Sequence, residues 1–134
     1  MHALKLIMIV SIFVGSSNLV AAENSVEKEL RKNKSLRCVA VAMEGKNLMK
    51  SNVMSADANF SQQNDTVLQN HKEQLRTNRP QGTEDEMSNA LYSLAKNEHK
   101  AMNVYISENI KDASEVEKFA KKFILNRYKT IGCL

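Results

Sequence analysis

The sequence contains few proline, glycine and aromatic residues, and this composition excludes several classes of protein. One Pro and four Gly in 134 residues exclude collagen-like chains and low-complexity chains rich in Gly and Pro. The formal net charge of +4 is too small for a strongly basic nucleic-acid-binding protein. The length allows one modest domain, and excludes two large domains or a multi-pass membrane protein.

Motifs that carry catalysis or hold a metal ion are also missing. The sequence has no Gly-rich phosphate loop, no Gly-x-Ser-x-Gly elbow and no Cys-x-x-Cys pair. His71 and His99 each lack a second His at the i, i+4 spacing of a helical zinc site. Acidic clusters at 84–86 and 115–117 suit first helical turns, where acids stabilise the positive end of the helix dipole. We therefore expect no enzyme, no cofactor and no metal site, and we expect Glu98 and His99 on a solvated helix face.

The longest apolar run lies near the N-terminus. Lys5 precedes the apolar residues 6–14, residues 15–18 interrupt the run with Gly, Ser and Asn, and small residues then precede a cleavage site. This three-part plan is typical of a secretory signal peptide, and the run is shorter than the roughly 20 residues of a membrane-spanning helix. We expect residues 1–22 to be removed and residues 23–134 to form a single helical domain. The alternative is a retained anchor that later leaves the membrane.

Export gives the two cysteines a structural role. Cys38 and Cys133 both lie in the mature part of the chain, and an oxidising compartment favours their pairing. An intramolecular bond would tie the first helix to the end of the last one. The alternative is a disulfide-linked dimer.

The first half of the mature chain shows helical spacing, and no segment alternates for long enough to require a strand. A first helix is expected to begin near residues 24–25, to bury Met43 in its apolar stripe and to stop at Gly45. Residues 48–60 predict a weaker, short helix. Asp65 is expected to cap a further helix that carries His71 on its apolar face.

The clearest interruption is the segment Thr77 to Gly82, in which Pro and Gly predict a surface loop. Thr83 and Glu86 then match a capping box, in which each side chain bonds to the backbone N–H of the other residue. The helix that follows is expected to reach Ile110, with a break near Asn97.

Ser114 and Glu117 match a second capping box, and Gly132 is expected to end the last helix. The basic face of this helix suits either a membrane surface or solvent, and we expect solvent. Together these patterns predict an all-α bundle of four to six helices, tied end to end by one disulfide.

Two stretches around the cysteines suggest a family. Residues 29–38 place Cys38 late in the first helix after a Lys/Asn-containing approach, and residues 128–134 place Cys133 after the last helix. With a signal peptide and a small helical domain, this plan resembles the periplasmic immunity proteins of type VI secretion amidase toxins. The resemblance implies a periplasmic or secreted toxin inhibitor that is not an enzyme. It also implies a protein partner, an exported cell-wall hydrolase, and leaves open a homodimer.

Such immunity proteins insert a surface element into the catalytic cleft of the toxin. In this chain the loop after Thr77 is the candidate, with Asn78, Arg79, Gln81 and Gly82 as partner-binding residues. Arg79 offers a planar side chain with several N–H donors for such a contact.

Two alternatives belong to other classes of protein. A phage-type periplasmic lysis regulator would use the N-terminal segment as a releasable anchor and bind the outer domain of a holin. A secreted helical carrier would hold a small apolar ligand in a cavity lined by Met87, Leu91, Phe119 and Phe123. Neither alternative involves nucleic acid, and cleavage of the signal peptide would leave no membrane span.

Overall fold

The computed structural model describes residues 25–51 and 57–134. No strand occurs in these two ranges, so the prediction of an all-α fold is confirmed. The expected signal peptide and part of the expected helix at 48–60 lie outside the described residues. The described helices are α2 (Ser25–Leu30), α3 (Lys34–Lys50), α4 (Ala58–Thr77), α5 (Glu84–Asn109), the short 3-10 helix η2 (Ala113–Glu115) and α6 (Val116–Ile131).

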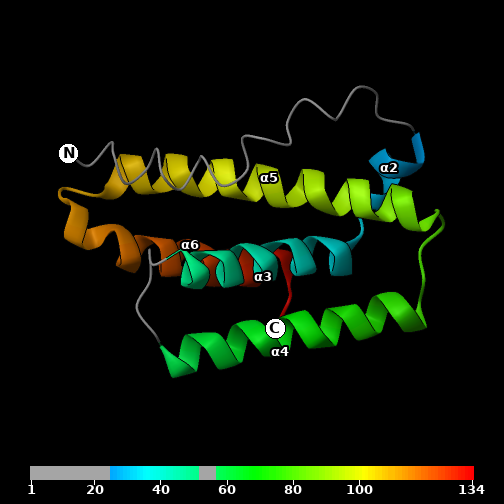
Figure 1. Ribbon diagram of the computed structural model, residues 1–134, viewed down its shortest axis with the longest axis horizontal. Coiled ribbons are helices and arrows are strands. Elements are labelled where there is room, and N and C mark those ends of the chain that lie inside the picture. Colours follow the sequence, from blue (N-terminus) through cyan, green and yellow to red (C-terminus); the bar gives the residue numbers. More distant parts are fainter. Residues whose placement is uncertain (1–24, 52–56) are drawn as a thin grey trace.

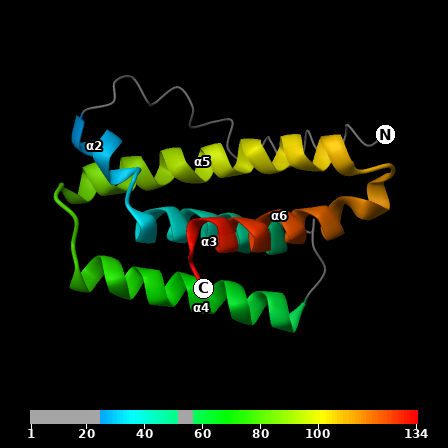
Figure 2. The same cartoon turned by 180° about the vertical axis from the view of Figure 1, so that it is seen from behind.

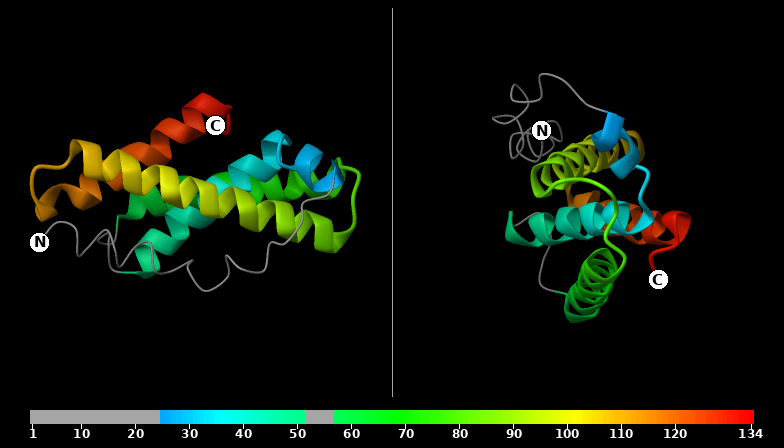
Figure 3. Two further views of the ribbon diagram at one scale, coloured as in Figure 1. Left: turned by 90° about the horizontal axis from the view of Figure 1, so that it is seen from above. Right: turned by 90° about the vertical axis from the view of Figure 1, so that its right-hand side faces the viewer.

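Helix α3 is the centre of the bundle. It packs against α4, α5 and α6, while α2 packs against α5. Figure 1 shows α5 and α4 on opposite sides of α3, with α6 behind α3, and the reverse view in Figure 2 shows α6 in front of α3. Seen from the end, α5, the α3–α6 pair and α4 form three successive tiers (Figure 3). Because α3 contacts all three of the other long helices, it has the largest share of buried side chains, among them Val39, Val41 and Leu48.

Gly45 does not end a helix, contrary to the sequence prediction. It lies within α3, at a point where the neighbouring helix α4 approaches so closely that a side chain would collide with it. The side-chain amide of Asn64 donates to the carbonyl of Ala42 at 2.8 Å and accepts from the hydroxyl of Tyr128. A Cβ atom on Gly45 would lie 3.0 Å from Asn64 Cγ and closer still to Oδ1. Burial raises the pKa of the Tyr128 phenol, which therefore stays a neutral donor.

Gly45→Ala is expected to destabilise the protein by about 1–3 kcal/mol, the usual effect of overpacking. The direction of this change in the free energy of unfolding is informative, since Gly→Ala in the interior of a helix normally stabilises the helix by about 0.5–1 kcal/mol. The measurement is urea unfolding of Gly45→Ala, Asn64→Ala and the double variant. Asn64→Ala removes the obstructing side chain, so the second substitution should cost less in that background. Additive effects of the two substitutions would contradict the assigned contact.

The start of α4 also differs from the prediction. Asp57 caps this helix, with a carboxylate oxygen accepting from the backbone N–H of Phe60 at 3.1 Å, and Asp65 lies inside the helix. The Asp57 carboxylate also pairs with the ammonium of Lys121 on α6, which lowers the pKa of Asp57. Asp57 therefore ties α4 to α6 as well as capping its own helix.

The segment that was predicted to form one helix from residues 24–25 to Gly45 forms two helices, α2 and α3. α2 ends at Leu30, and Asn33 caps α3 by accepting from the backbone N–H of Leu36 at 3.0 Å. Met43 faces solvent and is 39% exposed, so the apolar stripe of α3 is narrower than expected. The break after Leu30 lets α2 fold back onto α5.

The capping box of α5 is confirmed. Thr83 Oγ1 accepts from the N–H of Glu86 at 3.1 Å, and Glu86 accepts in return from the N–H of Thr83 at 2.9 Å. The expected break near Asn97 is wrong, because α5 continues to Asn109.

The second predicted capping box is also wrong. Asp112 starts the turn by accepting from the N–H of Ser114 at 2.8 Å, and no side chain caps α6 itself. Gly132 does end α6, in the left-handed conformation with a φ of 88°.

Candidate functional site

A disulfide between Cys38 and Cys133 joins α3 to the segment that follows α6. The sulfur atoms of Cys38 and Cys133 lie 2.12 Å apart within one chain, although 95 positions separate the two residues. The imidazole of His71 lies beside this bond, with Nε2 at 2.9 Å from the carbonyl oxygen of Cys133 and Nδ1 at 3.0 Å from the hydroxyl of Ser35. Because a carbonyl only accepts, Nε2 donates the hydrogen bond to Cys133. His71 therefore fastens the end of the chain to α4.

The same three residues form the one group of potential metal ligands in the ranges that the structure describes. The donor atoms of Cys38, His71 and Cys133 lie within 4.8 Å of one another. Both sulfur atoms are joined in the disulfide, so neither is a thiolate that could bind a metal ion. In its disulfide form the group has a structural role, because it joins α3, α4 and the segment that follows α6.

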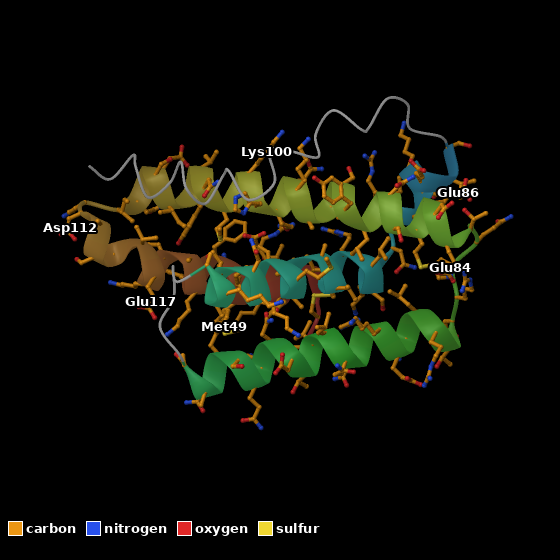
Figure 4. The ribbon with its side chains drawn as sticks, viewed as in Figure 1. Met49, Glu84, Glu86, Lys100, Asp112 and Glu117 are labelled. Atoms are coloured by element: carbon orange, nitrogen blue, oxygen red, sulfur yellow. A yellow bond between two sulfur atoms is a disulfide. The ribbon has the colours of Figure 1, made fainter. Side chains whose placement is uncertain are left out.

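Three of the four predicted loop residues are exposed at one end of the molecule. The segment after Thr77 runs along one end of the molecule, from α4 past the start of α3 to α5 (Figure 1). Asn78, Arg79 and Gln81 are exposed there, and we call these three side chains the end surface. Arg79 Nη2 lies 2.7 Å from a carboxylate oxygen of Glu84, with the two side chains 50% and 79% exposed. Figure 4 shows Glu84 at this end of α5.

Gly82 has an anchoring role and does not belong to the exposed surface. It adopts a φ of 149°, which side chains rarely allow. A Cβ atom at this position would lie 3.0 Å from Leu30 Cδ1 and 3.3 Å from Val26 Cγ1, both on α2. The loop is therefore packed against α2 at one side, and it leads directly into the capping box at Thr83. The prediction that Gly82 contacts a partner remains untested.

A buried polar pair lies between α3 and α5, where a solvated face was expected. His99 Nδ1 is 2.7 Å from a carboxylate oxygen of Glu44, and their side chains are 2% and 0% exposed. Asn47 and Asn103 follow one turn later on the same faces of these two helices, which run in the same direction (Figure 1). Within the described ranges, Oε2 of Glu44 and both amide atoms of Asn103 have no hydrogen-bond partner.

The sequence did contain a signal for this burial. His99 falls at helical spacing between Ala95, Met102 and Ile106, all of which are buried. Lys100, one residue further, points outward from α5 in Figure 4. The polar character of Glu98 and His99 suggested solvent, although the spacing of their apolar neighbours indicated the core.

Glu98 is also paired and largely buried. Its carboxylate accepts from Nε of Arg127 on α6, at 2.6 and 3.1 Å, and lies 2.6 Å from Nη2. This forked geometry fits a guanidinium to a carboxylate and holds α5 against α6. The expectation of a solvated Glu98 is wrong for the same reason as for His99.

The four residues proposed to line a carrier cavity are half-buried core residues. Tyr105 on α5 contacts both Phe119 and Phe123 on α6, with ring centroids 6.1 and 5.8 Å away. Met87 and Leu91 pack against the smaller cluster that joins α2, α3 and α5. Phe119 and Phe123 pack against the main core cluster, Met87 packs against the smaller one, and Leu91 packs against both.

None of the described helices combines the length and apolar character that a membrane crossing requires. Comparisons of the chain with protein-family models, with curated proteins and with solved structures find no match.

Proposed function

We propose that this chain is an exported inhibitor that binds and blocks a cell-wall-degrading hydrolase of the amidase type. The end surface is the element that enters or covers the catalytic cleft of the hydrolase. The observation that carries the proposal is the combination of three exposed polar side chains with an anchored backbone at one end of a helical scaffold. The resemblance of the cysteine-flanking stretches to amidase-toxin immunity proteins supports the same class of partner.

The scaffold suits inhibition because it limits the entropy lost on binding. Gly82 packs against α2, Thr83 and Glu86 fix the start of α5, and the disulfide ties α3 to the end of the chain. A loop that is already held in place loses little conformational freedom when it docks. Interfaces of this kind commonly concentrate binding energy in a few aromatic or Arg side chains.

Arg79 is the central residue of the proposed interface. Its pair with Glu84 is exposed, and exposed pairs contribute only about 0–1 kcal/mol. Exchanging Glu84 for a carboxylate or carbonyl group of the partner would therefore cost little. In a cleft shielded from water, the new contact would be stronger than the one that it replaces.

Arg79→Ala combined with Gln81→Ala is expected to weaken binding to the hydrolase by roughly 30-fold or more, the effect of losing an interface hot spot. The measurement is titration calorimetry with purified cell-wall hydrolases of the amidase type, beginning with any that is encoded beside this gene. Lys111→Ala serves as the control, since it removes an exposed positive charge beside Asp112 at the opposite end of the bundle (Figure 4). Equal affinities of the loop variant and the control would show that the end surface is not the interface.

The lysis-regulator alternative differs in the fate of the N-terminal segment. An inhibitor released by signal peptidase should begin at Glu23, whereas a regulator with a releasable anchor should keep its first 22 residues. Sequencing the N-terminus of the exported protein separates the two. A retained segment would favour a membrane-anchored regulator that binds a holin.

A further inference from the structure

A cavity of about 350 Å³ opens between α3, α5 and α6, apart from the end surface. Its walls include the apolar side chains of Ala40, Leu94 and Phe123. Two arginines, Arg37 and Arg127, also line it, together with Glu98. The volume lies at the small end of the range for ligand pockets, and the mixture of apolar walls and a few charged groups is typical of them.

The charges in this cavity leave a net positive charge. The Glu98 carboxylate is neutralised by the forked contact with Arg127. In the part of the chain that the structure describes, no carboxylate forms an ion pair with Arg37, and no contact engages Nη1 of Arg127. Two positive groups and one negative group sum to one positive charge, which a single anionic group would balance.

We propose that this cavity binds a small monoanionic amphiphile, a carboxylate with a short apolar chain. The carboxylate accepts a two-pronged pair of hydrogen bonds from Arg37, for which a guanidinium has the right geometry. The apolar chain lies against Leu94 and Phe123. This ligand site is separate from the end surface, so it does not depend on the proposed inhibitor function.

The pairing with Glu98 explains why Arg37, not Arg127, is the ligand-binding arginine. Glu98 is 9% exposed, and removing Arg127 would leave its carboxylate buried without a counter-charge. Arg37 is half-buried on α3 and carries no such structural pair. Replacing it therefore tests ligand binding without removing an ion pair that stabilises the fold.

The test is titration calorimetry of the purified protein with octanoate and with the uncharged octanol. Octanoate is expected to bind saturably, and octanol roughly tenfold more weakly, because it lacks the charge-assisted hydrogen bonds. Arg37→Gln should reduce octanoate affinity by a similar factor. Arg76→Gln is the matched control, since Arg76 is exposed on α4 and does not line the cavity.

A second variant tests the location of the site. Ala101 is exposed and lines the cavity, so Ala101→Phe fills the cavity without disturbing a buried position. It should abolish octanoate binding while leaving the unfolding midpoint unchanged. The proposal is overturned if octanoate does not bind saturably, if octanol binds equally well, or if Arg37→Gln and Ala101→Phe both bind octanoate like the wild type.

Discussion

Removing the disulfide between Cys38 and Cys133 is expected to lower the free energy of unfolding by about 4–5 kcal/mol. In the chain-entropy model, a bond that closes a loop of this length restricts the unfolded chain strongly. Domains are usually stable by about 5–15 kcal/mol in total, so this one bond supplies a large share. The reduced protein should therefore unfold at far lower denaturant concentration than the oxidised one.

Urea unfolding of the oxidised protein and of a Cys38→Ala, Cys133→Ala double variant measures this difference. The wild type unfolded in the presence of dithiothreitol should behave like the double variant. Mass measurement without reductant gives a monomer if the bond is intramolecular. A loss below about 1 kcal/mol, or a covalent dimer, would contradict the assigned role of the bond.

Glu44→Ala is expected to destabilise the protein by about 3–5 kcal/mol, the second-largest effect. The substitution leaves His99 in the interior without the carboxylate that accepts its hydrogen bond, and it opens space at the α3–α5 contact. Glu44→Gln should cost less, because the amide oxygen still accepts from Nδ1 of His99.

Thermal and urea unfolding of both Glu44 variants provide the measurement. Glu108→Ala is the control, since Glu108 is exposed on α5 and its loss should change stability by less than about 0.5 kcal/mol. If Glu44→Ala resembles this control, Glu44 is not buried against His99 in solution.

Features determined by neighbouring residues could be predicted from the sequence. The capping box of Thr83 and Glu86 involves positions three apart, and the left-handed stop at Gly132 is a property of one residue. The loop after Thr77 follows from the restricted backbone of Pro80 and the freedom of Gly82. In each case the structure is fixed within a few bonds along the chain.

Features determined by contacts between helices could not be predicted in this way. Glycine commonly ends helices, but Gly45 instead makes room for Asn64, which approaches from α4. Asp57 and Asp65 are both suitable caps, and a contact with Lys121 distinguishes the one that is used. At both positions a residue from another helix takes part, and the spacing of residues along one helix does not reveal it.

The same distinction between local features and contacts between helices applies to the candidate sites. Exposure of Asn78, Arg79 and Gln81 was foreseeable because a polar loop remains at the surface. The packing of Gly82 against α2, and the cavity beside Arg37, require the tertiary arrangement of three or more elements. Sequence spacing along one helix does not contain that information.

The most direct test of the proposed inhibition is to measure the release of peptidoglycan fragments by the amidase-type hydrolase that binds the exported protein, while titrating in that protein. We predict that the wild type stops the release at equimolar protein. The Arg79→Ala, Gln81→Ala variant should require a much higher concentration while keeping its unfolding midpoint. Undiminished hydrolysis in excess wild-type protein, or equal inhibition by the loop variant, would contradict inhibition through the end surface.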